Sequence, residues 1–171
     1  MSLMKYILIP YMLIGSSVAS IPASDTLSSK QRVIIEKWLA HNPEYRLAAD
    51  TDCDCDDDIK QMRTSNVGAW KAIPDYHPYI ATGDFNSDGS MDFAIVVINK
   101  HKLNHNYALV IFNGPFMNDS ISPAYFKSGL DLKGQGLSYG PPRPKPYRLI
   151  IGPFESEGAI LVPHGHTYKM E

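Results

Sequence analysis

The chain has few cysteines, little net charge and none of the signature motifs of common hydrolases. Two of its 171 residues are cysteine, and its formal net charge is −2. So small a charge gives no field for binding a polyanion, and we expect no nucleic-acid partner. The chain has neither a Gly-x-Ser-x-Gly elbow nor a His-Glu-x-x-His zinc motif. It also lacks the internal repeats that a β-propeller of at least about four blades requires.

The N-terminal residues have the features of a secretory signal peptide, which we predict over 1–20. Lys5 precedes an apolar stretch at 6–14, and the small residues at 17–20 offer a cleavage site. Met1–Leu3, ahead of a second methionine, are open to interpretation as a cloning remnant. The apolar stretch is too short for a membrane span, and no cysteine follows closely enough for a lipid anchor. We therefore expect a periplasmic or secreted protein without a membrane span in its mature form.

The two cysteines, Cys53 and Cys55, are one residue apart, and three states are open for them. They could form a strained local bridge, form intermolecular bridges or stay free thiols. The surrounding run Asp50–Asp58 should raise the pKa of a free thiol, which disfavours a reactive nucleophile. The same run has two interpretations of its own: a second cation site, or a loop followed by a short helix over 56–62. We favour the loop and helix, because carboxylates stabilise a helix N-terminus.

The hydrophobic pattern predicts one domain over 28–171, preceded by a flexible segment at 21–27. Ser28 or Ser29 can cap a helix over about 30–41, whose apolar stripe is typical of core contacts. Continuous apolar runs at 93–98 and 107–112 predict strands covered on both faces, at the centre of a sheet. Further strands are expected at 147–151, at 158–162 and near Tyr168, and the glycine-rich segment 126–140 is expected to be irregular. The predicted fold class is α+β, with a single antiparallel sheet and N-terminal helices packed on it.

The most informative stretch is Asp84-Phe-Asn-Ser-Asp-Gly-Ser-Met-Asp92, directly before the run at 93–98. Oxygen-bearing side chains stand at its positions 1, 3, 5 and 9, and Gly89 at position 6 permits a sharp turn. Three carboxylates and an amide oxygen suit Ca²⁺, a hard cation that takes six to eight oxygen ligands. A helix-loop-helix calcium site would need Glu at position 12, where this chain has Ile95.

With its apolar flanks, the loop resembles the calcium loops of FG-GAP/VCBS-type repeats, as found in integrin propeller blades. The resemblance covers about fifteen residues and implies a strand-loop-strand calcium site. By that resemblance the ligands are Asp84, Asn86, Asp88, the backbone carbonyl of Ser90, and Asp92. A polar turn without an ion is the alternative, since Asn-Ser-Asp-Gly is good turn chemistry by itself.

These features favour an exported, non-catalytic calcium-binding protein of an interaction, inhibitor or immunity type. Its partner would be another protein or a cell-envelope component. If it binds through a surface patch, an aromatic patch around Trp70 and Tyr76 is a candidate. The alternative is an exported hydrolase that uses carboxylate or histidine groups in a pocket.

Overall fold

The computed structural model describes residues 26–68, 71–117, 121–141, 145–154 and 156–171. The predicted signal peptide and most of the predicted flexible segment lie outside these residues. The elements are α1 (Ser29–His41), β1 (Tyr45–Leu47), a 3₁₀ turn (Asp50–Asp52), α2 (Asp56–Thr64), β2 (Ile80–Gly83), β3 (Asp92–Asn99), β4 (Tyr107–Phe112), β5 (Tyr125–Leu130), β6 (Gln135–Ser138), β7 (Leu149–Pro153), β8 (Ala159–His164) and β9 (Thr167–Met170). In the described part of the chain, neither helix is long and apolar enough to cross a membrane.

The α+β class is confirmed, but the strands form two antiparallel sheets where one was expected. The first sheet has the order β1-β3-β4-β5, with β2 also paired to β3, and the second has the order β6-β7-β8-β9. The expectation of irregular structure at 126–140 was wrong, since this segment supplies β5 to one sheet and β6 to the other. Its sequence is poor in residues of high strand propensity, so the pairing with β4 and β7 makes it extended.

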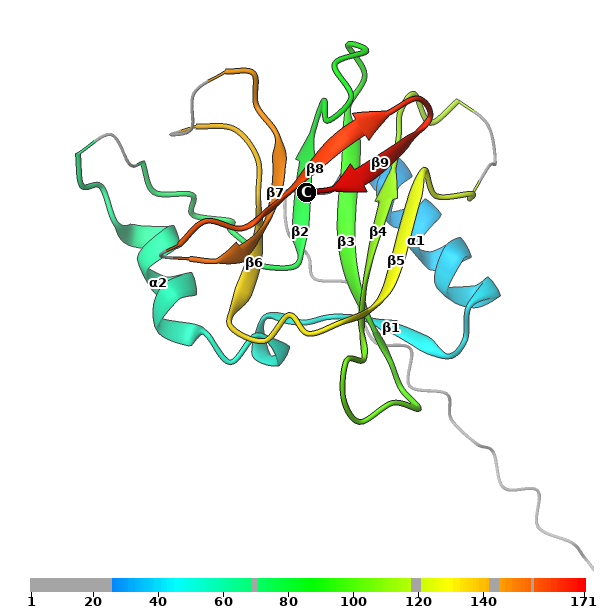
Figure 1. Ribbon diagram of the computed structural model, residues 1–171, viewed down its shortest axis with the longest axis horizontal. Coiled ribbons are helices and arrows are strands. Elements are labelled where there is room, and N and C mark those ends of the chain that lie inside the picture. The colour runs from blue at the N-terminus through cyan, green and yellow to red at the C-terminus, as the bar shows by residue number, and fades with distance from the viewer. Residues whose placement is uncertain (1–25, 69–70, 118–120, 142–144, 155) are drawn as a thin grey trace, which may run out of the picture.

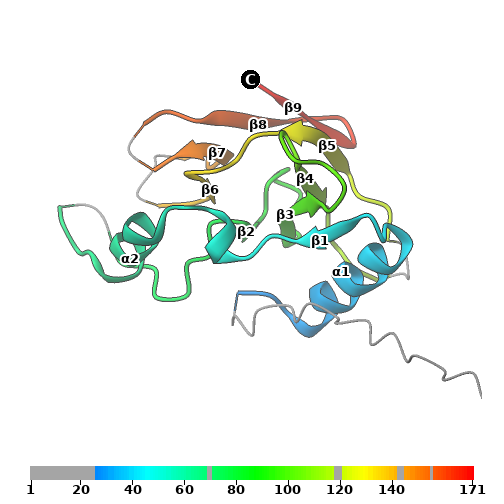
Figure 2. The ribbon, with the colours of Figure 1, turned by 90° about the horizontal axis from the view of Figure 1, so that it is seen from below.

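The molecule has three layers, with α1 on one face of the first sheet and the second sheet on the other (Figures 1 and 2). Strand β3 lies at the centre, where β1, β2 and β4 all pair with it. Its odd-numbered residues from Phe93 to Val97 pack with α1, and its even-numbered residues from Ala94 to Ile98 pack toward the second sheet. Alternation of side chains across a strand therefore explains why the whole run is apolar, as predicted.

Helix α1 begins where the sequence predicted a cap. The Ser28 hydroxyl accepts a hydrogen bond from the backbone N–H of Gln31, and the Gln31 side chain accepts one from the N–H of Ser28. This reciprocal pair satisfies two donors that a helix start leaves unpaired. The apolar stripe on the helix is core, as expected, because Ile34, Ile35 and Trp38 are buried against the first sheet.

The acidic run connects β1 to α2 and forms the start of that helix. Cys53 and Cys55 form a local disulfide, with their Cα atoms 5.2 Å apart. Three aspartates of the acidic run form the first turn of α2, which confirms the predicted helix. Asp52 is bound by Arg46 at 2.7 Å through both carboxylate oxygens.

The ion pair between Arg46 and Asp52 should make the free energy of unfolding depend on pH. The hydrogen bond from Arg46 holds the pKa of Asp52 below its ordinary value of 3.8. The stability from this pair is therefore complete above the unfolded-state pKa and is lost as the pH falls through the lower folded-state pKa. We expect Arg46→Met to raise the pKa of Asp52 in a carboxyl NMR titration. Lys169→Met, at an exposed pair with Glu171, is the matched control and should leave that pKa unchanged.

Candidate functional site

The predicted calcium loop is the turn between β2 and β3. Strand β2 ends at Gly83 and β3 begins at Asp92, and these two residues are paired across the hairpin. The loop projects beyond the end of the first sheet (Figure 1). The strand-loop-strand setting predicted from the flanking residues is thus confirmed.

Three of the predicted ligands hold the loop together through hydrogen bonds. The Asp84 carboxylate accepts the backbone N–H groups of Asp88 and Gly89, each at 3.0 Å. The Asp88 carboxylate accepts the Ser90 N–H at 2.8 Å and the Asn86 side-chain amide at 2.9 Å. Gly89 has φ +84°, a left-handed conformation that costs glycine little. The predicted sharp turn at this glycine is confirmed.

Asp92 lies beneath the loop and is fully buried, with an exposed fraction of 0%. Its two carboxylate oxygens accept the N–H of Phe85 at 2.8 Å and the N–H of Gly114 at 2.9 Å. Gly114 follows β4, so this one side chain joins the loop to a strand on the other side of β3. Burial raises the pKa of Asp92 above its ordinary value, in spite of these hydrogen bonds.

The pKa of Asp88 is shifted in the opposite direction from that of Asp92. Its side chain is exposed, and hydrogen bonds from Ser90 and Asn86 lower its pKa. The loop therefore carries an ionised carboxylate at its surface above a carboxylate whose charge is disfavoured by burial. A bound cation would compensate the negative charge of both groups.

The donor atoms fit Ca²⁺ in kind, since they are carboxylate, amide and carbonyl oxygens. Their side chains do not converge on a common point. In the described part of the chain, no three His, Cys, Asp or Glu side chains are grouped so as to hold a metal ion. Asp84 and Asp88 turn toward the N–H groups of the loop, and Asp92 points inward. In this arrangement the three carboxylates are engaged by backbone N–H groups.

Tyr139, just after β6, supports the loop from the second sheet, and sequence reasoning did not identify it. Its hydroxyl donates to the backbone carbonyl of Asp84 at 2.6 Å, and its ring lies 5.1 Å from that of Phe85. Gly83 allows this approach, because a Cβ there would collide with the Tyr139 ring. The first predicted ligand is therefore held in place by a residue 55 positions away in the sequence.

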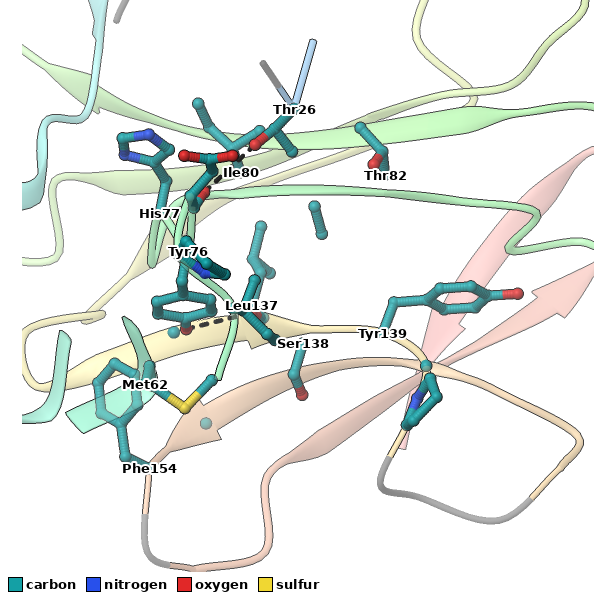
Figure 3. Close-up of a pocket in the computed structure, with 18 of the residues that line it drawn as sticks. Thr26, Met62, Tyr76, His77, Ile80, Thr82, Leu137, Ser138, Tyr139 and Phe154 are labelled. Atoms are coloured by element: carbon teal, nitrogen blue, oxygen red, sulfur yellow. Dashed lines mark hydrogen bonds between the residues drawn. The ribbon is translucent and has the colours of Figure 1, made fainter. Parts of the chain in front are cut away.

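Tyr139 also borders a cavity of about 400 Å³ between the two sheets (Figure 3). Met62, Tyr76 and Phe154 lie at one end of the cavity, and Thr82 and Tyr139 at the other. Tyr76 is buried and donates its hydroxyl to the carbonyl of Leu137 at 3.2 Å, so it is not part of an exposed patch. Trp70, the other residue of the predicted patch, lies outside the described residues.

A histidine–carboxylate pair stands at the margin of this cavity. His77 Nδ1 lies 2.9 Å from the Asp50 carboxylate, whose second oxygen accepts from Arg63 at 2.6 Å. Arg63 in turn donates to the backbone carbonyl of Tyr76. Figure 3 shows His77 pointing away from Ser138, the hydroxyl on the opposite wall. The arrangement fastens α2 to the approach to β2.

No protein-family model, no curated protein and no solved structure matches the chain.

Proposed function

We propose that this protein is an exported, non-catalytic calcium-binding module that acts by binding another protein or a cell-envelope component. The observation that carries the calcium proposal is the loop between β2 and β3. It combines the donor order Asp84, Asn86, Asp88, Ser90 and Asp92 with a fully buried carboxylate at its base. The ion would have a structural role, because the loop leads directly into the central strand.

The periplasmic or secreted location supports this proposal and rests on the predicted signal peptide. Calcium outside the cytoplasm is abundant enough to fill a weak site, with a Kd of about 10⁻⁴–10⁻³ M. The proposal of a non-catalytic role is supported by the Asp50–His77 pair, whose carboxylate is already engaged by Arg63. The hydrolase alternative would use carboxylate or histidine groups in a pocket, and His77, which borders the cavity, is one candidate.

Calcium should raise the melting temperature of the protein, and a chelator should lower it. At 10 mM Ca²⁺ a site of the expected affinity adds about 1.4–2.7 kcal/mol to the free energy of unfolding. This corresponds to about 3–10 °C for a domain of this size. The measurement is differential scanning fluorimetry of the full chain in EGTA and in Ca²⁺.

The double variant Asp84→Ala/Asp88→Ala should lose that calcium response. Asp131→Ala is the matched control, because Asp131 is an exposed aspartate outside the loop. It should keep the full response. A response that survives in the double variant would show that calcium binds elsewhere.

A further inference from the structure

The cavity beside Tyr139 lies between a strand of each sheet. Strand β2 borders it from the first sheet and β6 from the second. The two strands are bridged at one end, where the Leu137 N–H donates to the carbonyl of Pro78 at 2.7 Å. The backbone carbonyl of Leu137 is also engaged, because it accepts a hydrogen bond from the Tyr76 hydroxyl. Beyond this bridge the cavity lies between β2 and β6, up to the point where the Tyr139 ring meets Gly83 at the far end of β2 (Figure 3).

The edge of β2 that faces the cavity carries unpaired backbone groups. The carbonyl of Tyr79 accepts the N–H of Val96, so alternate residues from Tyr79 onward bond to β3. The backbone groups of Ile80 and Thr82 must therefore point the other way, and both residues line the cavity. In the described part of the chain, the N–H and C=O of Thr82 and the C=O of Ile80 have no hydrogen-bond partner.

Such an edge recognises another extended backbone. A row of unpaired donors and acceptors along a strand is a template for strand addition, in which an incoming peptide completes the ladder. The volume of about 400 Å³ falls within the range of ligand pockets and suits a short segment.

The side chains that line the cavity would select which side chains a bound segment can carry. The end formed by Met62, Tyr76 and Phe154 is apolar and would take an apolar side chain. Asp75 contributes an exposed carboxylate to the wall, and no ion pair engages it in the described part of the chain. This charge would favour a Lys or Arg in the bound segment.

We propose that this cavity binds an extended peptide segment of a partner protein, which adds as a strand to the outer edge of β2. The segment places an apolar side chain at the Tyr76–Phe154 end and a basic side chain near Asp75. A second copy of this chain fits less well, because its own folded strand would have to enter the space between β2 and β6. This inference rests on the proposed interaction role and does not depend on calcium.

The test uses a phage-displayed library of random heptapeptides, panned on the full chain and followed by synthesis of the enriched peptides. We expect enriched peptides that combine an apolar and a basic residue and bind in a fluorescence anisotropy titration. Thr82→Pro removes the outward N–H while keeping strand geometry, since proline is tolerated where no ladder bond is made. We expect it to weaken binding by about tenfold or more.

Thr82→Ala is the matched control, because it removes the side chain and keeps the N–H. Because the Thr82 side chain also borders the cavity, we expect a small loss of affinity, well below the loss in Thr82→Pro. Methylation of alternate backbone nitrogens of the peptide tests the same ladder without altering the protein, and it should weaken binding at those positions only. Phe154→Ala should also weaken binding, by emptying the apolar end of the cavity.

Three kinds of result would overturn the inference. The first is the absence of enriched peptides, or equal affinity in the unchanged protein and Thr82→Pro. The second is a dimer in sedimentation analysis that Thr82→Pro dissociates, which would assign the edge to a second copy. The third is binding on a glycan array that Phe154→Ala removes and Thr82→Pro does not, which would make the occupant a saccharide. The calcium response of the melting temperature should persist in Thr82→Pro, so failure of the peptide site and failure of the calcium site are distinguishable.

Discussion

Asp92→Ala should lower the free energy of unfolding by about 2–4 kcal/mol, even when calcium is chelated. The side chain is fully buried, and its two oxygens accept the N–H groups of Phe85 and Gly114. Alanine would leave both donors without a partner, and each unsatisfied buried group costs about 1–3 kcal/mol. Part of that cost is offset, because the variant no longer buries a carboxylate whose pKa is raised by desolvation. Urea unfolding in EGTA measures the difference.

Two further variants, Asp92→Asn and Asp131→Ala, are the references against which the loss of unfolding free energy in Asp92→Ala is compared. Asparagine keeps one oxygen acceptor but turns an amide donor toward the second N–H, so we expect a smaller loss than for alanine. Asp131 is exposed, and its replacement should change stability by no more than about 0.5 kcal/mol. A loss for Asp92→Ala as small as that of Asp131→Ala would show that Asp92 does not hold the loop against β4.

The residues of the loop were predictable from the sequence because they follow one another within nine positions. Local hydrogen bonds such as that from Gly89 to Asp84 depend on this spacing alone. The supports of the loop were not predictable, because Gly114 and Tyr139 reach it from distant parts of the chain. Neither residue belongs to a motif, and only the pairing of the strands brings them to the loop.

The same distinction holds for the fold. The apolar run of β3 identified a central strand without any knowledge of its neighbours, since only a strand covered on both faces is apolar throughout. Strands β5 and β6 gave no such signal, because β5 is largely exposed and β6 is only four residues long. The chain crosses from the first sheet to the second between β5 and β6, so the division into two sheets and the cavity between them depend on these two weak segments. The binding site proposed at β2 was therefore outside the reach of sequence patterns.

Trp38→Ala should lower the free energy of unfolding by about 3–5 kcal/mol and leave the calcium response intact. Trp38 is 5% exposed and holds α1 against the first sheet. Its ring lies 5.8 Å from that of Tyr45 and 6.1 Å from that of Phe126. Alanine would open a cavity among these rings, and losses of this size are usual for a buried aromatic side chain. Urea unfolding measures the loss, and near-ultraviolet circular dichroism reports whether the aromatic cluster persists.

Val33→Ala on the same helix is the matched control for Trp38→Ala. Val33 is 46% exposed, and alanine is the better helix former, so its replacement should be close to neutral. Equal losses in the two variants would mean that α1 is stabilised by its own helical tendency and not by packing. If Trp38→Ala also abolished the rise in melting temperature with calcium, the loop could not be treated as a unit held only by Asp92 and Tyr139. We expect the two effects to separate, because α1 packs on the face of β3 opposite the second sheet, from which Tyr139 reaches the loop.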